Sequence, residues 1–464
     1  TGVVAAALLA ASGSLAWSYG ALVLLALVGN GLAARWLLAR LGTGRVAALT
    51  GGAMTVLLPF VHAELGVLPL IPLAPMLLTL GALHAIAERP TWPRGAALGV
   101  AFAATWMSCA QYALLLALAL VAPVTVLAIR RSRAGAAARI ALARTFAVAL
   151  VASGVLLAPL LVGQLRARHS YGLARGAETV RGLSAGAEHY LRAPWPELVP
   201  TLGVDVAPRG RRALYPGTAK LALAAAALIA LRRSRDRRRL RGVAVAIGAA
   251  AVAIGAGPLL DVGPLSPHDA LAALVPGFGQ VRSVYRAAVL VQLVVVFLAA
   301  ESLDAAIAAR ARAGGTRRRR AALAASIGAA AVIAVVELWP QAQLLRAAPA
   351  EADHRGWTTW LATETPVDAV IAHLPFAPDP RSESFEPTAT WMYLQRLHRR
   401  PMANGYASFF PPQHATLWNR LGHFPDDTSL DALRRAGVAY CVVERGRYPD
   451  EALAAQSALT LRFA

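Results

Sequence analysis

Several side chains able to bind anions or transfer protons lie in one short stretch, residues 257–286, between two long apolar segments. The stretch contains two carboxylates, one imidazole and two guanidiniums: Asp261, Asp269, His268, Arg282 and Arg286. Arg282 and Arg286 are four residues apart, so a helix there would present both guanidiniums on one face at a membrane boundary. Paired guanidiniums suit a phosphate group. The alternative is that they anchor a helix end among lipid headgroups.

The other three polar side chains of this stretch are expected to line the same substrate cavity. Asp261, His268 and Asp269 could form hydrogen bonds with a ligand there. A short helix is predicted over residues 267–274, which would place His268 at the helix N-terminus, the end that favours an anion.

A second polar pair, His62 and Glu64, follows Phe60 in another predicted outward loop. Glu64 could take a proton from a hydroxyl nucleophile, and the pair could hold a divalent cation. Two ligands do not define a metal site, so no metal ligand and no cofactor is assigned. Polar residues at a membrane surface with no chemical role are the alternative.

The composition indicates a membrane protein. Hydrophobic residues make up 57% of the chain, charged residues only 15%, and the mean hydropathy is +0.51. This exceeds what a soluble core of 464 residues uses. The net charge of +21 comes from arginines in short clusters between apolar runs, which is typical of topology signals and not of a nucleic-acid-binding face.

About ten membrane spans are predicted, because each span needs roughly 20 apolar residues, fewer where small residues pack tightly. They cover residues 15–38, 46–61, 67–87, 95–109, 111–129, 140–163, 218–231, 242–257, 287–308 and 321–338. The arginine-rich loops fall at alternate ends of these spans and are assigned to the cytoplasm. Residues 164–217, 258–286 and everything after the last span are then outward-facing. This sidedness requires a turn between Cys109 and Gln111, where two short spans meet.

The composition changes after Trp339, where prolines, histidines and acids become frequent. Strand patterns over residues 367–376 and 438–443 alternate with predicted helices, which indicates a small extracytoplasmic α/β domain over residues 341–464 behind a membrane domain over residues 1–340. The loop 404–412, NGYASFFPP, carries aromatic side chains on which a sugar ring could lie, and a well-packed turn is the alternative.

Three groups of residues carry a family resemblance. They are PFVHAELGVLPLIPLAP (59–75), PGFGQVRSVYRAAVLVQL (276–293), and HLPF, RRPMANGYASFFPP and LRRAGVAYCVV in the tail. The chain resembles bacterial membrane glycosyltransferases of the GT-C superfamily, relatives of dolichyl-phosphate-mannose mannosyltransferases. The resemblance implies a multi-pass enzyme of the bacterial inner (plasma) membrane. It would take a sugar from a polyprenyl-phosphate donor and transfer it on the outer face to a glycan, lipid or protein.

One departure from this family concerns the catalytic acid. In such enzymes an acidic residue in the first outward loop acts as general base or metal ligand, and that region is expected upstream of this chain. The resemblance therefore assigns the acid to no numbered residue. Two other functions stay open: a transporter or flippase for a lipid-linked glycan, and a non-catalytic relative that binds glycan. No matched pair of broken helices, typical of repeat-built carriers, is visible in the sequence.

Overall fold

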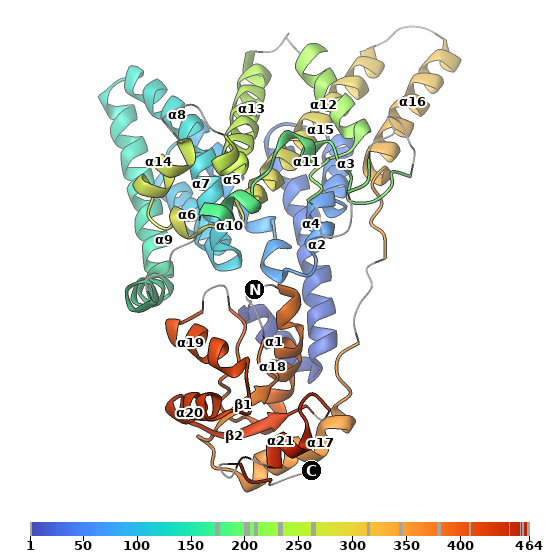
Figure 1. Cartoon of the computed structure of the whole chain (residues 1–464). Helices are drawn as coiled ribbons and strands as arrows, with labels where there is room; N and C mark the ends of the chain where they lie inside the picture. Colours follow the sequence, from blue (N-terminus) through green and yellow to red (C-terminus); the bar gives the residue numbers. More distant parts are fainter. Residues whose placement is uncertain are drawn as a thin grey trace. The chain divides into compact units, whose positions relative to one another are not determined.

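A computed structural model divides the chain into two compact units, Thr1–Arg166 with Ala174–Ala342, and Gln343–Ala464 with Ala167–Leu173 (Figure 1). The structure describes residues 2–171, 177–198, 205–207, 212–230, 235–260, 266–312, 316–342, 347–377, 382–407, 410–444, 446–454, 456 and 459–461. Asp261, one of the predicted cavity residues, lies outside the described residues.

The first unit is built almost entirely from helices. Its α-helices are α1 (Gly2–Ser12), α2 (Leu15–Arg40), α3 (Arg45–Val56), α4 (Pro59–Ala63), α5 (Ala74–Glu88), α6 (Trp92–Ser108), α7 (Ala110–Ala119), α8 (Val121–Arg133), α9 (Ala136–Tyr171), α10 (Ala177–Gly182), α11 (Ala187–Tyr190), α12 (Thr218–Ala230), α13 (Arg235–Ala256), α14 (Pro267–Leu274), α15 (Ala288–Arg312) and α16 (Arg317–Val336). Four short 3-10 helices lie among them: η1 (Leu68–Leu70), η2 (Gly257–Leu259), η3 (Phe278–Gln280) and η4 (Val284–Ala287).

Seven helical segments of the described chain are long and apolar enough to cross a membrane. They are Leu15–Arg40, Arg45–Ala63, Leu68–Glu88, Ala136–Tyr171, Arg237–Leu259, Val284–Arg312 and Arg317–Val336. Helices α7 and α8 meet at a bend of 47° and make an eighth if they count as one span. The described chain is therefore a helical, polytopic membrane fold.

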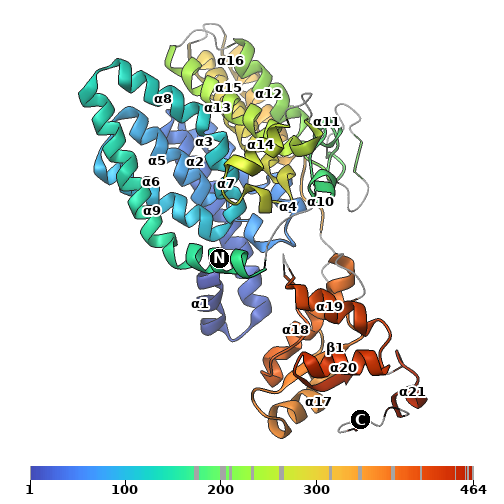
Figure 2. The same ribbon diagram turned by 60° about the vertical axis from the view of Figure 1, so that its left-hand side comes forward.

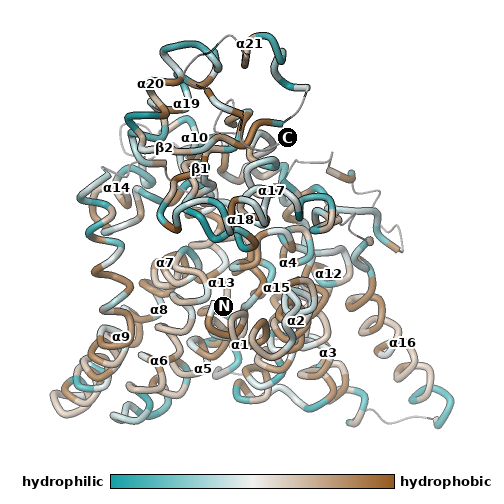
Figure 3. The backbone as a smooth tube through the Cα atoms, turned by 90° about the horizontal axis from the view of Figure 1, so that it is seen from below, coloured by the Kyte–Doolittle hydropathy of each residue, from teal (hydrophilic) through white to brown (hydrophobic). Residues whose placement is uncertain are grey.

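Two of these helices, α9 and α16, expose apolar side chains along most of their length. On α9, Leu150 and Val155 are 74% and 70% exposed, and on α16 Val332 is 60% exposed. Figure 3 shows apolar residues along much of both helices and polar residues at the N-terminal end of α16. Such faces fit contact with lipid chains, because lipid hydrocarbon is as apolar as leucine.

Glycines allow α6 and α9 to pack closely side by side (Figure 2). A Cβ atom at Gly95 would lie 2.3 Å from the carbonyl oxygen of Thr145, and one at Gly99 would lie 2.4 Å from that of Ala149. The two glycines are four residues apart and share one helix face. Small residues in this spacing bring membrane helices into backbone contact.

The turn predicted between Cys109 and Gln111 is confirmed. Helix α6 ends at Ser108, Cys109 has an extended backbone (φ −154°, ψ 103°), and α7 begins at Ala110. The predicted span 140–163 lies inside a longer helix, because α9 runs from Ala136 to Tyr171. Residues 164–171 include leucine, alanine and two arginines, which are good helix formers, and the next glycine is Gly172.

The second unit combines helices with a two-stranded parallel sheet. Strand β1 (Val370–Leu374) pairs with β2 (Val438–Val443), and Ala372 lies opposite Cys441. The helices are α17 (Glu351–Glu364), α18 (Glu386–His398), α19 (Pro412–Leu421), α20 (Asp427–Arg435) and α21 (Asp450–Ala454), with the 3-10 helix η5 (Ser382–Phe385). Parallel strands require a crossover connection, and α18, α19 and α20 lie in the segment that joins them.

Both strands lie within the stretches that the alternating pattern predicts. His373 and the other described residues at the carboxyl end of β1 are buried, as expected for a strand covered on both sides. A hydrophobic core of aromatic and aliphatic side chains forms around the sheet, with Leu374, Phe376, Leu421 and Leu433 among its members.

Candidate functional site

Glu64 and Tyr285 form the centre of the candidate site, which lies in the first unit. Glu64 caps the C-terminal end of α4 and is half-buried. The phenol of Tyr285, in the 3-10 turn η4 ahead of α15, donates a hydrogen bond of 2.6 Å to Oε1 of Glu64. The sequence pattern did not single out Tyr285, although it directly precedes Arg286. This contact joins two segments that lie 221 residues apart in the chain.

Arg286 is oriented by a neutral side chain. Its Nη1 donates to Oε1 of Gln111 at 2.8 Å, and Nε2 of Gln111 donates to the carbonyl oxygen of Ser283 at 2.6 Å. Gln111 has this position because α7 begins at Ala110, directly after the break at Cys109. The residues singled out in the sequence, Glu64 and Arg286, are thus brought together by two that were not, Tyr285 and Gln111.

The positive charge of Arg286 has no acidic partner among the residues that the structure describes. No described carboxylate forms an ion pair with it, and its buried Nε has no hydrogen-bond acceptor there. A half-buried cation without a counter-charge is costly in low-dielectric surroundings. An anionic ligand would supply both the missing charge and the missing acceptor.

A second guanidinium, that of Arg212, lies near the same aromatic ring. The Cζ atoms of Arg212 and Arg286 are 5.4 Å and 6.0 Å from the ring centre of Tyr285, within the range of cation–π attraction. Nη1 of Arg212 also donates to the carbonyl oxygen of Gly182 at 2.6 Å. No pattern in the sequence indicates Arg212, because it belongs to the predicted outward loop and contacts η4 only through the fold.

Arg282 does not share a helix face with Arg286, so that prediction is wrong. Val281 and Ser283 have extended or irregular backbones, and the helical turn begins only at Val284. Gly277, with φ +87°, precedes the 3-10 helix η3, and the non-helical backbones of Val281 and Ser283 separate η3 from η4. Arg282 is half-buried and has no hydrogen bond or ion pair with any described residue.

His62 is oriented by a contact to the backbone of the preceding helix. Its Nε2 lies 2.8 Å from the carbonyl oxygen of Val56, on the preceding helix, and it forms no ion pair with Glu64. Within the described parts of the chain, no group of three or more His, Cys, Asp or Glu residues is placed to hold a metal ion. That His62 and Glu64 together hold a divalent cation therefore stays a prediction.

His268 and Asp269 lie on α14, a helix over the same residues that the sequence predicts. Ser266 caps α14 and accepts a hydrogen bond of 3.2 Å from the backbone N–H of Asp269, whose side chain is exposed. His268 packs at 5.3 Å against the ring of Phe278 and lines a cavity of about 60 Å³. Burial lowers the pKa of His268. The structure brings neither residue into contact with Glu64 or Arg286.

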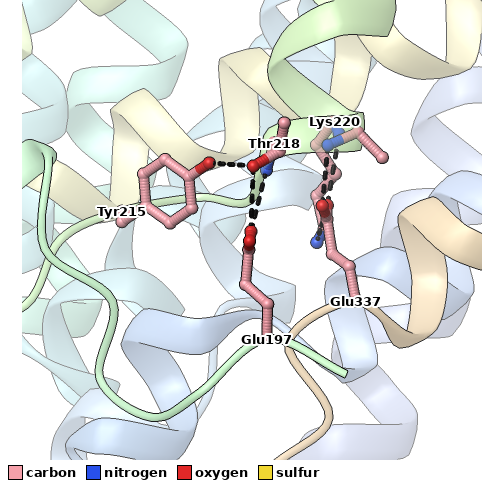
Figure 4. A network of polar contacts seen from close by, with 6 residues as sticks. Glu197, Tyr215, Thr218, Lys220 and Glu337 are labelled. Carbon is pink, nitrogen blue, oxygen red and sulfur yellow. Dashed lines mark hydrogen bonds and ion pairs between the residues drawn. The ribbon is translucent and has the colours of Figure 1, made fainter. Parts of the chain in front are cut away.

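A separate polar network surrounds Lys220, the single lysine of the sequence (Figure 4). Nζ of Lys220 is 2.8 Å from Oε1 of Glu337, and the two side chains are 1% and 2% exposed. Glu337 also accepts from the backbone N–H groups of Ala219 (2.7 Å) and Lys220 (3.2 Å) at the start of α12. One buried carboxylate thus neutralises the lysine and satisfies the first donors of a helix.

Glu197 extends this network into the loop ahead of α12. It accepts a hydrogen bond of 2.9 Å from Oγ1 of Thr218, and the phenol of Tyr215 also contacts that hydroxyl (Figure 4). The backbone N–H of Leu198 donates to the carbonyl oxygen of Glu337 at 2.8 Å. These contacts fix residues 212–217, the segment that carries Arg212, against the ends of α12 and α16.

No protein-family model matches this chain, and no curated protein is similar to it.

Proposed function

We propose that this protein is a membrane glycosyltransferase that uses a polyprenyl-phosphate-linked sugar. The observation that carries the proposal is Arg286: a half-buried guanidinium without an acidic partner among the described residues, beside the Glu64–Tyr285 pair. An anion site next to a carboxylate at the end of a membrane-spanning segment suits a substrate with a phosphate headgroup and a hydrocarbon tail.

The proposal includes the topology that the arginine-rich loops indicate. About ten spans place the start of α15 and the C-terminal α/β domain on the outer side of the bacterial inner membrane. The donor enters from the bilayer, its polyprenyl tail stays among lipid chains, and its headgroup reaches Arg286. The acceptor is a glycan, lipid or protein on the same side.

Each residue at the site has its own role in the proposed reaction. The bond between the sugar carbon and the phosphate oxygen breaks, and a bond from the acceptor oxygen to that carbon forms. Arg286 and Arg212 stabilise the negative charge that develops on the departing polyprenyl phosphate. Glu64 accepts the proton of the acceptor hydroxyl, and the phenol of Tyr285 orients this carboxylate. No residue is assigned to a metal.

The experiment is a transfer assay with the full-length protein in proteoliposomes that contain labelled polyprenyl-phosphate sugars. Transfer of label to an acceptor supports the proposal. Movement of the labelled lipid across the bilayer without transfer would show a flippase instead. Binding of glycan with neither transfer nor movement would show a non-catalytic protein. Assays with and without a chelator test the need for a divalent cation.

Two substitutions connect the assay to the site. Arg286→Ala should abolish transfer, whereas Tyr285→Phe should lower the rate about ten- to a hundredfold, because it removes one hydrogen bond to a charged group and keeps the ring. Arg312→Ala is the matched control, since Arg312 is the exposed last residue of α15 and, among the described residues, its side chain donates a hydrogen bond only to the backbone of Ala308. Unchanged transfer by Arg286→Ala in well-folded protein would remove this residue from the mechanism.

A further inference from the structure

A buried amide on α15 joins two segments that lie far apart in the sequence. Gln292 is 0% exposed. Its Oε1 accepts a hydrogen bond of 3.1 Å from the backbone N–H of Phe60, and its Nε2 donates one of 3.0 Å to the carbonyl oxygen of Leu214. The side chain therefore uses its acceptor on one segment and its donor on the other.

Each of these segments carries a residue of the candidate site. Phe60 is four residues before Glu64, and Leu214 is two residues after Arg212. Glu64 and Arg212 both lie against Tyr285, which is seven residues before Gln292. The same stretch of chain thus contacts both segments twice, through side chains at Tyr285 and through their backbones at Gln292.

Both backbone groups need a partner at this position. Phe60 lies in the first turn of α4, where N–H groups have no acceptor within the helix. The carbonyl of Leu214 belongs to a segment without helix or strand. Around them lie apolar residues such as Leu58, Val289, Leu293 and Val296. An unpaired backbone group in such surroundings is unfavourable, so one amide that satisfies both stabilises one relative position of the two segments.

We infer that Gln292 is a positioning residue that holds Glu64 and Arg212 at a fixed separation around Tyr285. The catalytic meaning of this inference rests on the proposed function. Gln292 sets the distance between the proton acceptor Glu64 and the anion-binding guanidinium of Arg212. Gln292 itself touches no reacting group. Its effect on chemistry passes through the two backbone segments that it joins.

The first test measures that separation without any ligand. Cys109 and Cys441 are changed to alanine, and cysteines are introduced by Glu64→Cys and Arg212→Cys in the full-length chain. Both contacts of Gln292 are to backbone atoms, so these changes leave them in place. A short bifunctional thiol reagent should link the pair efficiently. Adding Gln292→Leu should lower the yield of the link about fivefold, the size expected from losing hydrogen bonds of this kind.

The control is Leu303→Ala, which removes a 2% exposed side chain from the same helix eleven residues further on. It destabilises the protein without touching either backbone contact, so the yield should stay at its original value. An equal yield with and without Gln292→Leu would overturn the inference. An equal loss with Leu303→Ala would overturn it too, because the effect would then be general loosening of α15.

A binding measurement separates this inference from the proposed function. With the native Glu64 and Arg212, Gln292→Leu should weaken the binding of n-decyl phosphate, a short lipid phosphate, about tenfold. If the unaltered chain does not bind this probe, the proposed function fails, and the cross-linking result still decides the role of Gln292.

Discussion

Single residues at the candidate site were predictable only where they carry a charge. Glu64 and Arg286 were singled out as a carboxylate and a guanidinium near a predicted membrane boundary, and the structure places them in one cluster. Gln111, Arg212 and Tyr285 complete it, and each reaches the cluster through a contact over a long stretch of sequence. Such contacts leave no periodic pattern in the chain.

A buried histidine in the second unit gives a prediction about acid. His373 is 0% exposed and stacks on Trp391 with ring centres 4.7 Å apart and ring planes 9° apart. Neither of its ring nitrogens has a hydrogen-bond partner among the described residues. Burial, and to a smaller extent the nearby His398, lowers the pKa of His373 to about 3. The folded unit therefore holds this imidazole neutral.

The lowered pKa of His373 predicts loss of stability as the pH falls. In the unfolded chain, His373 has an ordinary pKa of 6.5 and takes up a proton below that pH. In the folded unit, it takes up the proton only near pH 3. The contribution of the neutral His373 imidazole to the free energy of unfolding is complete above pH 6.5 and is lost as the pH falls from 6.5 to about 3. Each pH unit between the two pKa values corresponds to about 1.4 kcal/mol of unfolding free energy. His373→Phe should flatten the dependence of unfolding on pH in that range.

The rate at which the thiol of Cys441 is modified can report the unfolding of this unit in acid. Cys441 lies on β2, and burial raises the pKa of its thiol to about 12 in the folded unit. In a Cys109→Ala chain, a pyridyl disulfide reagent that reacts in acid should modify Cys441 increasingly fast below pH 6.5, the ordinary pKa of the histidine, and less so after His373→Phe. Equal acid dependence in the two chains would show that His373 does not contribute.

Helices and strands were predicted well where local pattern decides them. Helix α14 begins where Pro267 indicates a helix start, and strand β2 coincides with the apolar run 438–443. The break at Cys109 follows from the length of the apolar stretch and the required sidedness. The predicted helix through Arg282 and Arg286 is wrong because Val281 and Ser283 are not helical and the helical turn starts only at Val284. Helix α9 is longer than the span predicted within it, since a polar sequence can continue a helix beyond its apolar part.

The buried ion pair between α12 and the end of α16 allows a test at this scale. Glu337→Gln leaves the charge of Lys220 buried without a partner, and Lys220→Met leaves that of Glu337, so each should cost about 3–5 kcal/mol. The double change Lys220→Met with Glu337→Gln should recover much of this loss. Thermal unfolding in detergent measures all three. Additive losses in the double variant would show that the two charges do not depend on each other.

At the scale of the whole molecule, the structure agrees with the composition. Several described helices can cross a membrane, and the second unit contains a parallel sheet. The number of spans is harder to derive, since short helices such as α12 (13 residues) fall below the length of a usual span. The direction in which the helices cross rests on the arginine-rich loops alone. Sidedness therefore needs its own experiment.

Cysteine labelling in intact cells tests the proposed sidedness. In a chain without Cys109 and Cys441, an impermeant thiol reagent should modify cysteines introduced at the exposed residues Ala63 and Ala352. A cysteine introduced at Ala311, near the end of α15, should react only after the cells are opened. Labelling of Ala63 and Ala352 from opposite sides would separate the candidate site from the second unit and exclude a shared outer compartment.

The enclosure of Lys220 makes ordinary amine chemistry a readout of folding. No other lysine exists in the sequence, so succinimidyl esters find no accessible side-chain amine on the native chain. A tag on Lys220 then counts molecules in which α12 and the end of α16 have come apart, and mass spectrometry of a single peptide reports it.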